Sequence, residues 1–162
     1  MGRFDRGGKN PVQSAWDRFS RLPGGKRIFS FFLGRVAPYT GTIRPRVVEI
    51  RKGFARVQMK DRRGVRNHLN SIHAMALVNL GEVVTGVAML YGLPDGARGI
   101  VTGFEIDYLK KARGLLTAEC ESPSVTSTVR AEYEVPGTIR DQAGDVVARV
   151  RAKWLIGPAK AE

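Results

Sequence analysis

The residues best suited to chemistry lie in one segment, from Asn67 to Glu82, which contains both histidines of the 162-residue chain. Between Arg66 and Asp95 the only Lys, Arg, Asp or Glu is Glu82, which falls within the apolar run AMALVNLGEVVTGVAMLYGL. A carboxylate is costly to desolvate, so one kept in such surroundings is often there for a reaction. Glu82 is therefore the candidate general base or nucleophile.

The start of this apolar run is a candidate oxyanion site. We expect a helix over about residues 71 to 91, preceded by Asn67, His68, Ser71 and His73. The first N–H groups of a helix have no partner within it and lie at the positive end of its dipole. The backbone around His73 and Ala74 is thus suited to bind the oxygen of a carbonyl under attack.

Each of these residues also has a plainer structural explanation. His68 and His73 can cap the helix or fill the core, and for His68 we favour that explanation. Asn67 can fix its own loop by bonding to nearby backbone. Glu82 can be a buried carboxyl that is satisfied by Asn67 or by a backbone donor.

The composition predicts one cytoplasmic domain without structural metal. A chain of 162 residues buries enough surface for a full core. Cys120 is the only cysteine, and no Cys/His spacing resembles a zinc site. Residues 1–10 are charged and Gly-rich, so we expect a disordered tail there and a single domain over residues 11–158. The N-terminal stretch lacks the apolar core of a signal peptide.

The net charge of +12 predicts attraction to polyanions, which include nucleic acid, a membrane surface and a phosphate-rich cofactor. A solvated basic surface that keeps the protein soluble is the simpler alternative. A spanning helix is disfavoured because Asn79, Glu82 and Thr85 lie at the centre of the apolar run, so we expect no membrane partner. Nucleic acid is not expected either. The basic stripe Arg149, Arg151 and Lys153 lacks interleaved aromatics and can pair across a hairpin with the segment from Arg130 to Glu134.

Hydrophobic spacing predicts an α+β order. One or two helices are expected between residues 11 and 34, and Pro38 to Gly41 is expected to be a turn. The expected strands cover about residues 42–51, 54–60, 100–108, 115–121, 127–135 and 146–156. The links between the later strands are too short for crossover helices, so the strands should be antiparallel neighbours. A single sheet wrapped around the apolar helix satisfies this order.

Two motifs carry a resemblance to a known family. Arg66-Asn67-His68 leads into His73 and then Glu82, and Tyr108-Leu109-Lys110-Lys111-Ala112-Arg113-Gly114 follows the third strand. Over about residues 14–157 the chain resembles the hotdog-fold thioesterase superfamily, and is most similar to a bacterial branch related to the phenylacetyl-CoA type. The resemblance implies an α+β hotdog fold, with about six antiparallel strands around a long central helix and an N-terminal helix.

The resemblance also implies roles for the residues. In that thioesterase type an Asn precedes His-Gly-Gly at the helix start, and an acid follows on the helix. Asn67, His73 and Glu82 match the Asn, the His and the acid, whereas Ala74 and Met75 replace the two glycines. The implied function is an acyl-CoA thioesterase, in which the Ala74 N–H binds the thioester carbonyl and no cofactor is needed beyond the coenzyme A moiety of the substrate. The alternative is a non-catalytic acyl-CoA- or lipid-binding protein.

Helix geometry predicts that the site is shared between two subunits. Nine residues along a helix correspond to about 13 Å of rise and about two and a half turns, so Glu82 points away from the face that carries His73. We therefore expect a homodimer, or a dimer of dimers, in which one subunit supplies the carboxylate and the other the oxyanion donor.

The substrate's two ends have separate candidate sites. An apolar channel between the helix and the sheet, bounded by Phe104, Met75 and Met89, is expected to take the acyl chain. Clustered cations suit the phosphates of coenzyme A, although they can equally be a solvated strand end. The candidates are Arg62, Arg63, Lys110, Lys111 and Arg113.

Overall fold

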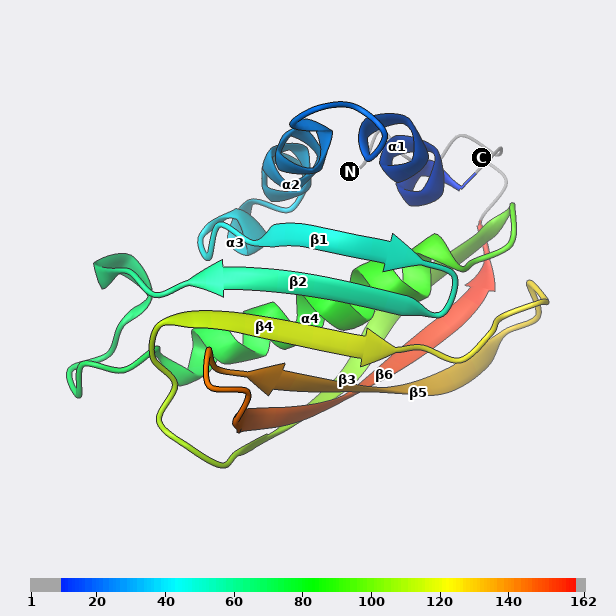
Figure 1. Cartoon of the computed structure of the whole chain (residues 1–162). Helices are drawn as coiled ribbons and strands as arrows, with labels where there is room; N and C mark the ends of the chain where they lie inside the picture. Colours follow the sequence, from blue (N-terminus) through cyan, green and yellow to red (C-terminus); the bar gives the residue numbers. More distant parts are fainter. Residues whose placement is uncertain (1–9, 160–162) are drawn as a thin grey trace.

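The apolar run forms the helix around which the rest of the chain is arranged. A computed structural model describes residues 10–159, and in it α4 (Ala74–Tyr91) lies in the hollow of a curved sheet (Figure 1). By length and composition α4 is apolar enough to cross a membrane, yet most of it is buried inside the protein. The expected buried helix is confirmed, and it starts later than the predicted residue 71 because His73 forms its N-cap.

One antiparallel sheet of six strands wraps this helix. Its spatial order is β1-β2-β4-β5-β6-β3, with every pair of neighbours antiparallel. In β2 the side chains of Val57 and Met59 are buried against α4, as the alternating pattern predicts. The strands are β1 (Arg46–Arg51), β2 (Phe54–Lys60), β3 (Ala97–Tyr108), β4 (Leu115–Glu121), β5 (Ala131–Arg140) and β6 (Val146–Pro158).

The N-terminal helices cover one edge of the sheet. α1 (Pro11–Phe19) and α2 (Gly25–Val36) lie above β1 in Figure 1. Trp16 anchors them, because its buried indole N–H donates to the carbonyl of Ile50 at 3.0 Å. The predicted tail lies outside the described residues except for Asn10, which caps α1 by accepting from the N–H groups of Val12 and Gln13.

Three local expectations are wrong. Residues Pro38–Gly41 form a helical turn, α3, where a simple turn was expected, and β1 starts at Arg46 after it. β5 spans Ala131–Arg140 instead of residues 127–135. β5 can continue through Pro136 because β4 pairs with β5 only from Gly137 onward. At Pro136 no hydrogen bond to β4 requires the N–H that proline lacks.

The basic stripe on β6 also pairs differently from the prediction. Lys153 does lie opposite Glu134, but Arg151 lies opposite Pro136. The Arg151 guanidinium instead contacts Glu105 at 2.8 Å and Asp107 at 3.2 Å on β3. Part of the stripe is thus neutralised by the neighbouring strand, which leaves a weaker surface for nucleic acid.

Glycine brings α4 close to the sheet. A Cβ placed on Gly81 would lie 2.7 Å from Val150 Cγ1 and 2.9 Å from the Phe104 ring, both closer than real contacts allow. Met89 is also fully buried. The space expected to form an acyl channel beside Phe104 and Met89 is therefore filled by side chains within the protomer.

We expect Gly81→Ala to destabilise the fold. Overpacking costs about 1–3 kcal/mol, and the better helix propensity of alanine returns about 1 kcal/mol, so the free energy of unfolding should fall by up to about 2 kcal/mol. Urea denaturation measures it. Gly92→Ala at the other end of α4 is the matched control, because its Cβ would meet nothing closer than 3.6 Å. Equal effects of the two substitutions would contradict the packing argument.

Candidate active site

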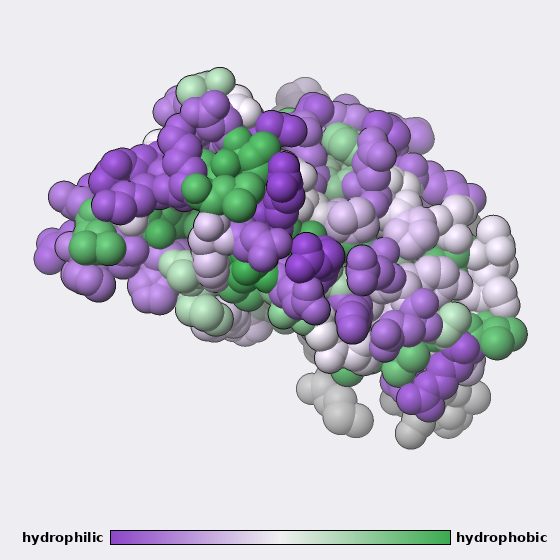
Figure 2. Space-filling model, turned by 90° about the horizontal axis from the view of Figure 1, so that it is seen from below, coloured by the Kyte–Doolittle hydropathy of each residue, from purple (hydrophilic) through white to green (hydrophobic). Residues whose placement is uncertain are grey.

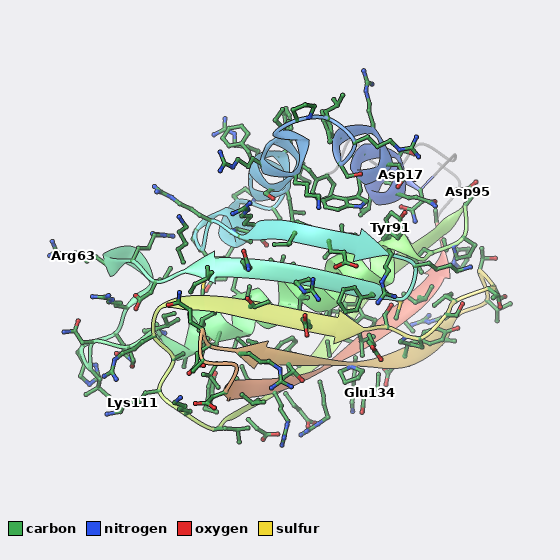
Figure 3. All side chains as sticks on the ribbon, in the orientation of Figure 1. Asp17, Arg63, Tyr91, Asp95, Lys111 and Glu134 are labelled. Atoms are coloured by element: carbon green, nitrogen blue, oxygen red, sulfur yellow. The ribbon has the colours of Figure 1, made fainter. Side chains whose placement is uncertain are left out.

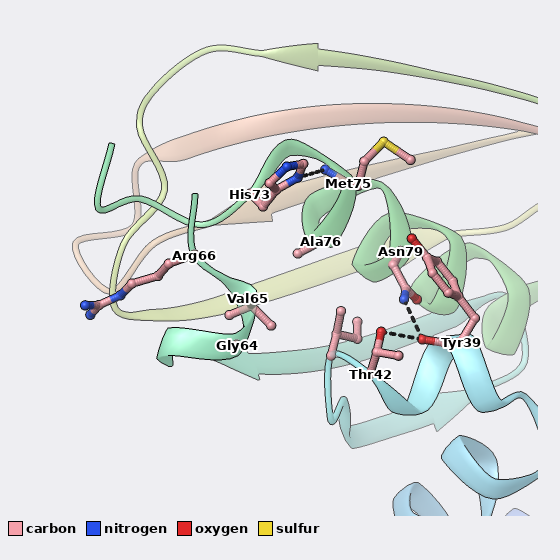
Figure 4. A pocket seen from close by; sticks show the side chains of 10 residues that line it. Tyr39, Thr42, Gly64, Val65, Arg66, His73, Met75, Ala76 and Asn79 are labelled. Carbon is pink, nitrogen blue, oxygen red and sulfur yellow. Dashed lines mark hydrogen bonds between the residues drawn. The ribbon is translucent and has the colours of Figure 1, made fainter. Parts of the chain in front are cut away.

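The start of α4 presents one backbone donor that is unpaired within the described part of the chain. His73 caps the helix, and its Nδ1 accepts from the N–H of Met75 at 3.1 Å (Figure 4). The N–H groups of Ala76 and Leu77 bond to the carbonyl of His73. Within residues 10–159 the N–H of Ala74 has no hydrogen-bond partner. The donor predicted from the sequence is therefore free to bind an oxygen.

A cavity of about 190 Å³ opens beside this helix start. In Figure 4 its walls come from α3 and the turn after it, from the loop before α4, and from the first turns of α4. Its lining residues are Tyr39, Thr42, Ile43, Gly64, Val65, Arg66, His73, Met75, Ala76 and Asn79.

Asn79 is a polar residue of this cavity to which the sequence analysis gave no role. The residue is 4% exposed, and its Nδ2 donates to the carbonyl of Tyr39 at 3.0 Å (Figure 4). Its Oδ1 is buried and has no partner in the described chain. Such an acceptor is rare in native proteins and is suited to receive a donor from a ligand. The available signal was an amide in an apolar run, three residues before Glu82 and so on the same face.

Glu82 lies on the half-exposed side of α4 and does not line this cavity. Val78 and Glu82 are half-buried there, and Met75 is 51% exposed. The Glu82 carboxylate makes no hydrogen bond or ion pair with residues 10–159, and burial alone raises its pKa. The structure thus leaves Glu82 unpaired, unlike the plainer explanation in which Asn67 or a backbone donor satisfies it.

Asn67 organises the loop before α4. Its Oδ1 accepts from the N–H of Leu69 at 2.9 Å and from both the N–H and the hydroxyl of Ser71 at 3.2 Å. These bonds match the structural explanation considered for Asn67. His68 is exposed in the same loop.

The five predicted phosphate-binding cations lie at the end of the molecule where α4 begins, as labelled Arg63 and Lys111 show in Figure 3. Lys110 is already neutralised by Asp141 at 2.9 Å and by Asp145. The Arg113 Nε donates to the carbonyl of Asn70. Arg63 and Lys111 are exposed and form no ion pair among the described residues. This cluster therefore has less free charge than its composition indicates.

Two other chemistries find little support in the described chain. Residues 10–159 contain no group of three or more His, Cys, Asp or Glu side chains placed to hold a metal ion. Burial raises the pKa of the Cys120 thiol to about 12, so it is not a thiolate nucleophile at neutral pH.

Residues 25–156 match a family model described as a domain of unknown function, DUF4442. The chain belongs to this family. Among solved structures, the structural-genomics protein APC5556 is 30% identical with a TM-score of 0.78, over 91% of this chain and 98% of that one. No curated protein is significantly similar in sequence.

Two further solved structures share the fold at lower identity. A protein of unknown function from Pseudomonas aeruginosa, named a probable thioesterase, is 22% identical with a TM-score of 0.71, over 85% of this chain and 97% of its own. A thioesterase family protein from Silicibacter pomeroyi is 16% identical with a TM-score of 0.68, over 91% and 98%. These likenesses confirm the predicted hotdog fold.

The raised pKa of Glu82 predicts a pH-dependent stability difference. The folded state holds this proton more tightly than the unfolded chain, so stability falls as pH rises from the unfolded pKa through the folded one. Glu82→Gln removes that loss. The variant should gain stability over the wild type at about pH 7 relative to about pH 4, measured by urea denaturation.

The control is Glu134→Gln, at an exposed residue that forms no ion pair within the described chain. Its difference from the wild type should be the same at both pH values. A pH-independent difference for Glu82→Gln would show that the carboxyl is not desolvated.

Proposed function

We propose that this protein is an acyl-CoA thioesterase. The observation that carries the proposal is a pair of groups on α4 that find no partner within residues 10–159. They are the N–H of Ala74 at its start and the carboxylate of Glu82 on its half-exposed side. Thioester hydrolysis needs one group to bind a developing oxyanion and another to take a proton from water. Two structures of the same fold, one named a probable thioesterase and one a thioesterase family protein, support this reaction class.

In the proposed reaction Glu82 takes a proton from water as the water oxygen attacks the thioester carbon. The carbonyl oxygen becomes an oxyanion and accepts a hydrogen bond from the Ala74 N–H. The intermediate then collapses, the C–S bond breaks, and the sulfur leaves with the proton that Glu82 returns. The products are a carboxylic acid and coenzyme A. A raised pKa suits Glu82 to this exchange, because it brings the carboxyl closer to neutral pH.

The proposed active unit is a homodimer. The outer edge of β1 is covered by α2, whereas the outer edge of the twelve-residue β3 pairs with no strand of residues 10–159. An open edge of this length is a template for another strand. Figure 2, the underside of Figure 1, shows hydrophobic residues reaching the surface among hydrophilic ones, and the exposed apolar side chains include Ile100, Tyr108 and Leu109.

The β3 edge runs beside the half-exposed side of α4. The Tyr108 hydroxyl donates to the carbonyl of Ala74 at 3.3 Å, and the Phe104 ring lies against Gly81. A second copy paired along β3 would therefore meet the side of α4 that carries Glu82. This arrangement supports a site in which the carboxylate and the oxyanion donor come from different subunits.

Two substitutions test the reaction. Glu82→Gln should lower kcat for acyl-CoA hydrolysis by about 10²–10⁴-fold, the usual contribution of a general base. Ala74→Pro should lower it by about 10²–10³-fold, because it removes one oxyanion donor. Proline is well tolerated at the first residue of a helix, so the fold should be retained. Free-thiol detection with a panel of acyl-CoA thioesters gives the rates.

The outcome separates the enzyme from the alternative binding protein. Lost hydrolysis with retained ligand binding supports catalysis. If neither substitution changes the residual turnover of the wild type, the protein is an acyl-CoA- or lipid-binding member of the fold.

Mixed dimers test the shared site. Co-expressed Glu82→Gln and Ala74→Pro subunits form some dimers in which one site combines an intact carboxylate with an intact Ala74 amide. We expect these heterodimers, purified with two affinity tags, to regain about half of the wild-type kcat, since only one of their two sites is intact. If both groups act within one subunit, every site keeps a defect and the mixture stays as inactive as its parents.

A further inference from the structure

A second cavity, of about 540 Å³, lies between α2, α3 and the start of β1. Four arginines line it, and no acidic side chain of residues 10–159 does. We call it the arginine groove and define it by Arg27, Arg35, Arg44 and Arg46. In Figure 3 nitrogen-tipped side chains gather around this corner of the molecule.

The charge of the arginine groove is not balanced within the described chain. All four arginines are exposed, and none makes an ion pair with residues 10–159. Other cations of the protein are paired, such as Arg56 with Glu119 at 2.6 Å and Arg66 with Asp61 at 2.6 Å. Clustered guanidinium groups without acidic partners repel one another, and a bound polyanion relieves that repulsion.

An adjoining cavity of about 270 Å³ extends the basic surface. It shares Arg44 and Arg46 with the groove and adds Lys60 and Arg62. The Arg62 Nε is buried and has no partner among the described residues, while the terminal nitrogen Nη2 donates to the carbonyl of Thr42. Burial and the nearby charge of Arg44 both lower the pKa of Arg62. A bound anion offsets both the desolvation of the Arg62 guanidinium and its repulsion by Arg44.

Arg44 is held in an unfavourable backbone conformation. Its φ is 50°, in the left-handed region that favours glycine and asparagine. Such a residue costs about 1–3 kcal/mol, and strain of this kind tends to collect at ligand sites. The turn places the Arg44 side chain where both cavities share it.

The groove also offers an aromatic face. Phe31 lines it and is 63% exposed, and the Arg35 guanidinium carbon lies 6.0 Å from the centre of its ring. Arginines beside an open aromatic ring are suited to a nucleotide, since phosphates pair with the guanidinium groups and a base stacks on the ring. A lipid headgroup or free phosphate would use the charges alone.

Shared lining residues link the arginine groove, through the adjoining cavity, to the cavity at the start of α4. The adjoining cavity shares Ile43 with the 190 Å³ cavity that is lined by His73 and Asn79. We propose that the arginine groove binds the nucleotide of coenzyme A, with its phosphates on the arginines and its base on Phe31, so that the pantetheine arm extends toward Ala74. This inference rests on the proposed function, and it moves the nucleotide away from the neutralised Lys110.

Calorimetric titration of the full-length protein with coenzyme A tests the inference without any hydrolysis. Arg44→Asn keeps a residue that tolerates the left-handed conformation, and Arg46→Gln lies at the exposed start of β1. Each should weaken binding of coenzyme A about tenfold or more, because each removes a charged hydrogen-bond donor. Dephospho-coenzyme A should bind more weakly than coenzyme A to the wild type. Phe31→Leu should weaken both ligands while the charge is unchanged.

The matched control is Arg149→Gln, which removes one exposed arginine on β6 outside the groove. It should leave the affinity for coenzyme A unchanged, and circular dichroism checks that every variant is folded. Unchanged affinity in both groove variants overturns the inference, and so does an equal loss in the control. Binding to vesicles of phosphatidylcholine with phosphatidylglycerol, without binding to coenzyme A, overturns it in favour of a lipid surface.

The same experiments separate this inference from the proposed function. If the wild type hydrolyses acyl-CoA while the groove variants keep their affinity, only the groove assignment fails. If coenzyme A binds through the groove but no thioester is hydrolysed, the groove assignment is correct and the proposed thioesterase activity is wrong.

Discussion

The burial of one apolar helix is the constraint on which the rest of the structure depends. An 18-residue helix that is apolar on nearly every face gains stability only where other elements cover it. Six strands curve far enough to cover most of α4, and Gly81 lets β6 and Phe104 approach it closely. One side of the helix remains half-open beside the outer edge of β3, which pairs with no strand of the described chain. The only Lys, Arg, Asp or Glu of the apolar run, Glu82, lies on that side.

Much of this arrangement could be predicted from the sequence because it follows from local periodicity. The continuous apolar run predicted α4, and the alternation of Ala55, Val57 and Met59 with polar residues predicted the half-buried β2. The boundaries were less accurate where long-range contacts decide them. β5 passes through Pro136 because β4 pairs with β5 only from Gly137, and no local pattern records how far a neighbouring strand extends.

The candidate site could be predicted only in part, for a similar reason. The N–H of Ala74, which is unpaired within residues 10–159, follows from the position of the helix start, so it could be predicted from the sequence. Asn79 was not assigned a role, because its meaning depends on the carbonyl of Tyr39, forty residues earlier in the chain. The arginine groove likewise joins α2 to the start of β1. Its members look like scattered surface charges until the packing of α2 on the sheet brings them together.

The cap at the start of α4 also determines which nitrogen of the His73 ring carries the hydrogen. Because Nδ1 accepts from the N–H of Met75, a neutral imidazole in this position must bear its hydrogen on Nε2. His73 therefore combines two roles at one helix end, as an acceptor toward its own backbone and as a donor on its outward edge. The bond that caps the helix thus selects the tautomer, and the neutral ring then presents an Nε2–H donor on its outward edge.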